Sequence, residues 1–223
     1  MKRAIIFTNG RLDETPAITK KLLPTDLIIA VDGGTLHCRS LGIKPDIIIG
    51  DFDSLDTREV TVYRQAGVEM IQYPSHKNET DLELALQLAL KRSVSEVFII
   101  AALGARWDMS IANILLMTHP MFSGLIIHLM DGIQEFRILR SAEQVDLYGQ
   151  PGDIISLIPL AGDAQGITTR GLEYPLNNET LYFGSPRGIS NVFIQNHACI
   201  ELRQGILLCI LNWVENDRVF AEQ

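Results

Sequence analysis

The chain has 223 residues, with 19 Lys and Arg against 27 Asp and Glu, and a formal net charge of −8. Hydrophobic residues make up 47% and charged residues 21% of it, a composition typical of globular proteins that excludes a disordered chain or a fibrous repeat. The length suits one large domain or two small ones. Non-specific binding to nucleic acid needs a surplus of Lys and Arg, so we expect no nucleic-acid partner.

The apolar segments are too short for a membrane protein. None approaches the roughly 20 residues that cross a bilayer, and the apolar stretch at the start of the chain stops at Asn9-Gly10, too early for a signal peptide. Cys38, Cys199 and Cys209 are too few for a disulfide scaffold or a zinc site, so we expect them in the core. These features predict a cytoplasmic protein without a membrane partner.

Up to about residue 130, short continuous apolar runs alternate with segments of helical periodicity. Such runs are typical of strands buried on both faces of a parallel sheet. Their alternation with helices predicts βαβ units and an open parallel α/β sheet. The expected strands are 4–7, 27–31, 47–49, 97–100 and 125–129, and the expected helices are 15–23, 36–41, 57–66, 81–91 and 110–117.

Beyond about residue 135 the helical signals stop and turn clusters recur. Short β-prone segments lie between these clusters, a pattern typical of a compact β-sandwich. The expected strands are 154–158, 192–194, 198–202 and 206–211. The fold class we expect is therefore α/β plus all-β, with an α/β domain over residues 1–134 and a β-sandwich over residues 135–223.

Glycine and carboxylate residues follow three of the predicted parallel strands. Asp32-Gly33-Gly34 follows the second strand, Gly50-Asp51-Phe52-Asp53 follows the third, and a segment from Gly104 to Asp108 follows the fourth. Ligands of open α/β sheets bind outside the carboxyl ends of the strands. The three segments together therefore predict a ligand site at this edge of the sheet.

Asp51 and Asp53 are two residues apart, so in an extended segment their carboxylates point to the same side. Their repulsion raises one pKa unless a cation lies between them. A hard divalent ion with oxygen ligands, such as Mg²⁺, fits that arrangement. The alternative is an ordinary Asp-Ser turn in a solvated loop, and these two residues alone do not decide between them.

The clearest helix of the chain begins at Thr80 or Asp81. Thr80 is a natural N-cap, and Glu83 stands where a capping box needs it. Capping does not account for Lys77, which the preceding loop places beside the helix N-terminus, where anions bind. The alternative for Lys77 is a solvated surface lysine.

Several common motifs are missing from the sequence. It contains no G-x-G-x-x-G, no G-x-x-x-x-G-K-[ST] and no G-x-S-x-G segment, and its five histidines lack metal-ligand spacing. These absences argue against a classical NAD site, a P-loop enzyme, a hydrolase and a zinc site. In the second half, small polar residues over 187–191 interrupt the strand rhythm, and composition alone favours a turn there over a ligand site.

Taken together and in order, these segments resemble the thiamine pyrophosphokinase family over nearly the whole chain. The matching motifs are Asp32-Gly33-Gly34, Gly50-Asp51-Phe52-Asp53-Ser54, Lys77-x-x-Thr80-Asp81-x-Glu83, Gly104-x-Arg106-x-Asp108 with Asn113, Gly171-Leu172-x-Tyr174-Pro175-Leu176 and Gly188-Ile189-Ser190-Asn191. The resemblance implies transfer of the pyrophosphoryl group of ATP to the hydroxyl of thiamine, giving AMP and thiamine diphosphate. It also implies a homodimer with active sites at the subunit interface, in which residues 1–134 bind ATP and residues 135–223 bind thiamine and form the dimer.

The resemblance further implies roles for individual residues. Asp51, Asp53 and Asp81 correspond to Mg²⁺ ligands and, with Lys77, to the catalytic set. Ser190 and Asn191 correspond to residues that contact the thiamine pyrimidine. The residues that correspond to the ATP pocket are Asp32, Gly33, Gly34, Lys77, Arg106, Asp108 and Asn113.

Three positions depart from the family pattern. Met109 stands where the family usually has His, Ala105 where it often has a second glycine, and Val192 where an acidic residue is common. Two alternatives therefore stay open: a pyrophosphokinase for another hydroxymethyl heterocycle, and a catalytically idle protein that binds thiamine or thiamine diphosphate. The intact carboxylates and lysine favour an active enzyme.

Overall fold

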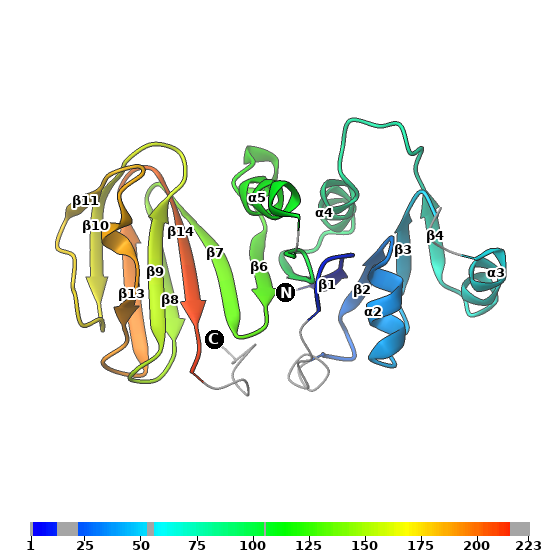
Figure 1. The fold of residues 1–223 in the computed structure, drawn as a ribbon, viewed down its shortest axis with the longest axis horizontal. Helices are drawn as coiled ribbons and strands as arrows, with labels where there is room; N and C mark the ends of the chain where they lie inside the picture. The colour runs from blue at the N-terminus through cyan, green and yellow to red at the C-terminus, as the bar shows by residue number, and fades with distance from the viewer. Residues whose placement is uncertain (1, 13–21, 53–55, 105, 215–223) are drawn as a thin grey trace. The chain divides into compact units, whose positions relative to one another are not determined.

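The computed structural model describes residues 2–12, 22–52, 56–104 and 106–214. The chain divides into two compact units, Met1–Asp131 and Gly132–Gln223 (Figure 1). This division lies close to the domain boundary expected after residue 134. No helix in the described ranges is both long and apolar enough to cross a membrane.

A parallel sheet forms the centre of the first unit. In spatial order its described strands are β6 (Ile126–Asp131), β5 (Glu96–Ile100), β1 (Arg3–Phe7), β2 (Leu27–Val31), β3 (Ile47–Gly50) and β4 (Glu69–Gln72). The central strand β1 pairs with β2 on one side and β5 on the other. The chain therefore winds away from β1 in both directions, and a crevice opens at the carboxyl ends of these strands.

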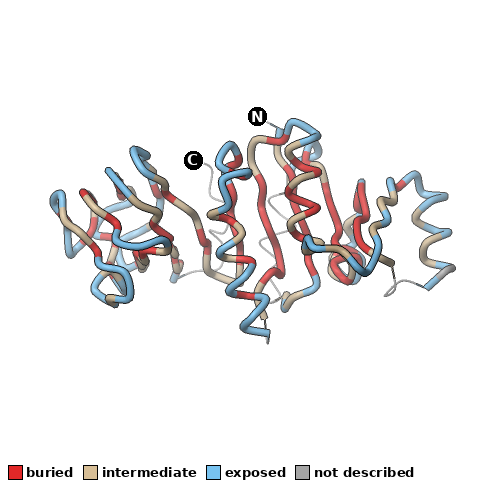
Figure 2. Tube along the Cα trace, turned by 90° about the horizontal axis from the view of Figure 1, so that it is seen from above, coloured by how far each residue is buried: buried red, intermediate tan, exposed pale blue. Residues whose placement is uncertain are grey.

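Helices cover both faces of this sheet. Figure 1 shows α4 and α5 on one face and α2 on the other. The described helices are α2 (Gly34–Ser40), α3 (Thr57–Gln65), α4 (Asp81–Lys91), α5 (Trp107–Leu116) and the 3₁₀ turn η1 (Pro120–Phe122). The strands of the sheet are the most continuously buried part of this unit (Figure 2), as the apolar runs predicted.

The α/β class and the five predicted parallel strands are confirmed. The sequence did not predict β4, because this edge strand is only partly buried and lacks a continuous apolar run. Of the helix expected over 15–23, residues 15–21 lie outside the described residues, and residues 22 and 23 are not helical. The other four expected helices are present, with bounds shifted by up to three residues.

The start of α4 is capped as the sequence predicted, but only by half of the capping box. Thr80 Oγ1 accepts a hydrogen bond from the Glu83 N–H at 3.2 Å. The Glu83 carboxylate instead accepts one from Gln87 Nε2 at 3.4 Å. A complete capping box occurs at α3, between Asp56 and Glu59.

Two antiparallel sheets form the second unit, which confirms the all-β class predicted there. One has the order β12 (Asn191–Val192), β9 (Ile154–Pro159), β14 (Ile206–Asn212) and β7 (Gln134–Arg140). The other has the order β11 (Glu179–Leu181), β10 (Ala164–Arg170), β13 (His197–Leu202) and β8 (Glu143–Tyr148). The sequence missed β7, β8, β10 and β11, whose polar residues hide the strand pattern; β8, for example, buries one residue of its six.

Candidate active site

A cavity of about 690 Å³ lies in the first unit at the carboxyl ends of β1, β2 and β5. Its walls are the segments that follow these three strands and the first turns of α4 and α5. The lining residues are Thr8, Asn9, Gly10, Arg11, Val31, Asp32, Thr80, Asp81, Leu82, Ala102, Leu103, Gly104, Arg106, Met109, Ser110 and Asn113. Three residues predicted to bind ATP are among them, Asp32, Arg106 and Asn113, together with Asp81, which was predicted as a metal ligand.

Main-chain geometry at the end of β2 turns Asp32 toward the next strand. Asp32 has a φ of 44°, a left-handed conformation that Asp tolerates better than most residues. A Cβ on Gly50, at the end of β3, would lie 1.7 Å from Asp32 Oδ1. Glycine at position 50 therefore leaves the space that the Asp32 carboxyl group occupies.

Negative charge is concentrated around Asp32. The pKa of Asp32 is raised from 3.8 to about 7, first because the group is buried, then because of its interaction with Asp81 and the charge of Asp51. The positive charge of Lys77 opposes this rise. Near neutral pH, the Asp32 carboxyl group is therefore only partly ionised.

Lys77 is not the solvated surface lysine of the alternative interpretation. Its Nζ lies 2.8 Å from Asp81 Oδ1, and its side chain is 13% exposed. Burial alone would lower its pKa, but the hydrogen bond to Asp81 and the charges of Asp81, Asp32 and Asp51 raise it. Lys77 is therefore a fixed positive charge beside the carboxylates.

These carboxylates suit a divalent cation. Asp32 Oδ1 is buried and receives no hydrogen bond from any donor in the described part of the chain. Crowded carboxylate oxygens are the ligands that Mg²⁺ prefers. Asp53, one of the three predicted ligands, lies outside the described residues, and within those that are described no three His, Cys, Asp or Glu side chains form a complete metal site. The ligand set Asp51, Asp53 and Asp81 thus stays a prediction.

The remaining residues predicted for ATP take different positions. Gly33 and Gly34 lie so close to the end of β1 and to Asn9, two residues beyond it, that a side chain would collide there. A Cβ on Gly33 would be 2.0 Å from Asn9 Oδ1, and one on Gly34 would be 2.0 Å from Phe7 O. Arg106 and Asp108 form an ion pair at the cavity rim, with Nη2 and Oδ2 2.5 Å apart and side chains 74% and 64% exposed. An exposed pair of this kind can open to receive an anionic ligand at low cost.

Sequence reasoning missed the segment after β1, which supplies Thr8, Asn9, Gly10 and Arg11 to the cavity wall. This segment has no carboxylate next to its glycine, so the pattern that identified the other strand ends did not apply. The sequence signal that could have identified this segment is Asn9-Gly10, a polar dipeptide shortly after a buried strand.

In the second unit, Ser190 and Asn191 differ in accessibility. Ser190 is exposed, has a φ of 58° and donates its N–H to Ser156 Oγ at 3.1 Å. Asn191 is 7% exposed. Its side-chain amide forms hydrogen bonds with the main chain of Tyr174: Oδ1 accepts from the Tyr174 N–H at 3.0 Å, and Nδ2 donates to the Tyr174 carbonyl at 2.7 Å. Asn191 thus holds the segment that carries the exposed ring of Tyr174.

Comparison with known proteins agrees with this architecture. Residues 18–129 match the family model described as the thiamin pyrophosphokinase catalytic domain, and residues 142–207 match the thiamin pyrophosphokinase vitamin B1 binding domain. A thiamine pyrophosphokinase of Bacillus subtilis is 31% identical over 210 residues, which are 94% of this chain and 98% of the relative.

Solved structures agree as well. A crystal structure of the thiamine pyrophosphokinase from Bacillus subtilis superposes with a TM-score of 0.85 at 30% identity, covering 96% of this chain and all of the other. A thiamin pyrophosphokinase family protein from Enterococcus faecalis superposes with a TM-score of 0.81 at 25% identity, with coverage of 96% and 100%. The chain belongs to the thiamine pyrophosphokinase family.

Proposed function

We propose that this protein is an ATP-dependent diphosphotransferase that converts thiamine and ATP to thiamine diphosphate and AMP. The observation that carries this proposal is the cavity with Asp32, Asp81 and the fixed charge of Lys77 at one end. In a chain of this family, that arrangement supports binding of a triphosphate next to the reacting hydroxyl.

The reaction joins the thiamine hydroxyl oxygen to the β-phosphorus of ATP and breaks the bond between that phosphorus and the oxygen bridging to the α-phosphate. The AMP phosphate leaves with the electron pair of the broken bond. Lys77 and Arg106 supply positive charge to the phosphate oxygens as negative charge shifts during transfer. The hydroxyl proton passes to a carboxylate beside the cavity, for which Asp32, with its pKa raised to about 7, is the candidate.

Asp51, Asp53 and Asp81 are the residues we propose to hold Mg²⁺. A divalent cation held there would offset the charge of the phosphate oxygens. Without the cation, Asp32, Asp51 and Asp81 would repel the phosphates of ATP. Among the described residues, Lys77 supplies positive charge to these carboxylates.

We further propose a homodimer whose active sites lie at the subunit interface. The exposed face of α5 supports this dimer, because the helix exposes apolar side chains and buries polar ones. Trp107, Ile111 and Leu115, spaced four residues apart on one face, are 76%, 54% and 46% exposed, whereas its buried residues are Ser110 and Asn113. An apolar helical face of this kind marks an interaction surface. In the dimer, Ser190 and Asn191 of one subunit form the thiamine side of a site whose phosphate side belongs to the other.

A direct assay tests the activity. The purified protein is incubated with thiamine, ATP and Mg²⁺, and AMP and thiamine diphosphate are separated and quantified. We expect the two products in equal amounts and no product when EDTA removes the metal. Binding of thiamine without formation of AMP would contradict the proposal and favour the idle binding protein.

Subunit mixing tests the shared site. An Asp81→Asn chain and an Asn191→Ala chain should each be nearly inactive, and their mixture should recover up to about a quarter of the wild-type activity. The physical reason is that half of the chains pair as mixed dimers, in which one of the two composite sites is intact. No recovery after subunit exchange has been demonstrated would mean that each site is built within one chain.

A further inference from the structure

The wall of the cavity that follows β5 is held by two polar side chains of α5, which are themselves part of the cavity lining. Ser110 and Asn113 are 4% and 7% exposed. They lie three residues apart, so both face the same side of the helix. They are the buried residues of a helix whose apolar side chains Trp107, Ile111 and Leu115 are exposed.

Hydrogen bonds from these two side chains go to the main chain of the wall. Ser110 Oγ accepts from the Gly104 N–H at 3.2 Å and donates to the Arg106 carbonyl at 3.1 Å. Asn113 Nδ2 donates to the Ala102 carbonyl at 2.7 Å. The amide nitrogen of Asn113 is thus engaged with protein rather than directed at a ligand.

The opposite side of this wall leaves no room for adjustment. The Gly10 N–H donates to the Ala101 carbonyl at 2.6 Å, and the Arg11 N–H donates to the Leu103 carbonyl at 2.9 Å. A Cβ on Gly10 would lie 2.2 Å from Ala101 O. The segment after β1 and the segment after β5 are therefore in direct contact. On the side of α5, the Ser110 hydroxyl holds Gly104 and Arg106.

We infer that Ser110 is a positioning residue of the nucleotide pocket, a role that rests on the proposed function. It acts through Gly104, which lines the cavity, and through Arg106, whose side chain leaves the wall one residue before α5 begins. Loss of its hydroxyl removes the hydrogen bond of the part-buried Gly104 N–H, which costs free energy. The wall then relaxes, and the pocket binds ATP less tightly while the thiamine side is unchanged.

The test compares Ser110→Ala, Ser110→Thr and the wild-type protein, with Thr118→Ala as a matched control. Thr118 Oγ1 likewise donates to an earlier carbonyl, that of Leu115 at 2.7 Å, but this exposed hydrogen bond lies just beyond the other end of α5. Calorimetry measures the Kd for ATP, and steady-state kinetics measure KM for ATP and for thiamine separately. Thermal unfolding establishes that each variant is folded.

We expect Ser110→Ala to raise the Kd and KM for ATP by about tenfold, the fold-change that corresponds to the loss of one hydrogen bond. KM for thiamine should not change in Ser110→Ala. Ser110→Thr, which keeps a hydroxyl group, and the control Thr118→Ala should both bind ATP as tightly as the wild type. Wild-type ATP affinity in Ser110→Ala would overturn the inference and leave the proposed function intact. Equal losses for ATP and thiamine, or no rescue by Thr, would overturn it as well, because they indicate a general structural defect.

Different results would refute the proposed function and the role of Ser110. A wild-type protein that binds no ATP would refute the proposed function itself, and the inference with it. If Ser110→Ala does not fold, Ser110→Cys replaces it, since the thiol fills the same space but forms weaker hydrogen bonds. The same criterion then applies: weaker ATP binding at constant KM for thiamine supports the inference, and unchanged ATP binding overturns it.

Discussion

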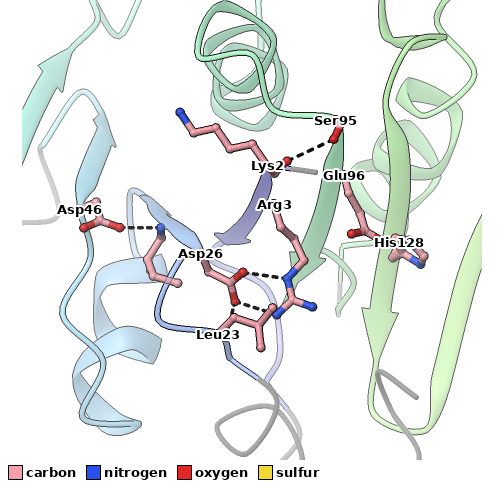
Figure 3. A network of polar contacts seen from close by, with 9 residues as sticks. Lys2, Arg3, Leu23, Asp26, Asp46, Ser95, Glu96 and His128 are labelled. Atoms are coloured by element: carbon pink, nitrogen blue, oxygen red, sulfur yellow. Dashed lines mark hydrogen bonds and ion pairs between the residues drawn. The ribbon is translucent and has the colours of Figure 1, made fainter. Parts of the chain in front are cut away.

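Carboxylates at the two ends of the parallel sheet differ in whether hydrogen-bond and ion-pair partners satisfy them. At the amino end, Asp26 is fully matched (Figure 3): Arg3 Nε and Nη2 lie 2.7 and 2.8 Å from its two oxygens, and the Leu23 N–H donates to it at 2.8 Å. Asp46, an exposed carboxylate at the same end, accepts from the Ile28 N–H at 2.8 Å. At the carboxyl end, Asp32 keeps a buried oxygen that no described donor reaches, and its pKa is raised to about 7.

This difference separates a structural use of charge from a functional one. A paired and hydrogen-bonded carboxylate holds strands and loops together, and it has no capacity left for a ligand. Crowded carboxylates with too few donors destabilise the fold unless a cation or a proton joins them. The unmatched end is therefore where we place the chemistry, and the following predictions test this assignment.

The largest effect is expected from Asp81→Asn, at the unmatched end. It removes one proposed metal ligand and the partner of Lys77, so turnover should fall by about a thousandfold while the protein stays folded. Asp53→Asn should act in the same way. Glu79→Gln, which neutralises an exposed carboxylate two residues earlier, should have wild-type turnover. Near-normal activity in folded Asp81→Asn and Asp53→Asn proteins would refute the shared metal.

At the matched end, Asp26→Asn should reduce stability rather than catalysis. It removes the charge that pairs with the Arg3 guanidinium, whose side chain is 17% exposed, and the free energy of unfolding should drop by about 3 kcal/mol. Urea denaturation measures this drop. Asp46→Asn keeps an oxygen for the Ile28 N–H and should cost about 1 kcal/mol or less. A large loss of turnover in folded Asp26→Asn protein would contradict the division between the two ends.

Lys77→Ala should lower turnover by about a hundredfold with little change in thiamine affinity. The lysine supplies positive charge where the phosphate bond breaks, and thiamine is assigned to the second unit. Steady-state kinetics with ATP and calorimetry with thiamine, on the same variant, measure the two effects. Lys91→Ala, at the exposed end of α4, is the control. A loss of thiamine affinity alone would mean that Lys77 serves the other substrate.

The smallest effect concerns pH and Asp32. In the folded protein Asp32 keeps its proton up to a pKa of about 7, whereas the unfolded chain releases it near 3.8. The folded state therefore binds more protons between these values, and stability falls as the pH rises from about 4 to about 7. Without metal, the melting temperature of the wild type relative to Asp32→Asn should fall over this range and then level off. Parallel pH profiles for the two proteins would show that Asp32 has an ordinary pKa.

Much of the fold was readable from local patterns. Continuous apolar runs identified the strands of the first unit other than β4, because a strand buried on both faces cannot carry polar residues. Thr80 marked the start of α4, because an N-cap acts on N–H groups two or three residues away. Edge strands such as β4 and β8 escaped this reasoning, since an exposed strand may carry almost any residue and is defined by its neighbour's hydrogen bonds.

The sequence predicted residues for the candidate site but not their arrangement in space. Asp32 and Asp81 are far apart in the sequence, and only packing of α4 beside the end of β2 brings them together with Lys77. Asn113 and Asn191 matched motifs as ligand contacts, yet their amide groups hold the main chain at Ala102 and Tyr174. A sequence motif records which side chain a position needs, and it does not distinguish a group that meets the ligand from one that shapes its pocket.

The sequence by itself determined the fold class, the family and the edge of the sheet where the site lies, because these depend on residue types and their spacing along the chain. The tertiary structure alone decided which carboxylates are paired and which are crowded, and that α5 turns Ser110 and Asn113 inward. These properties depend on distances between segments remote in sequence, and burial and electrostatic interaction take their values only once those distances exist.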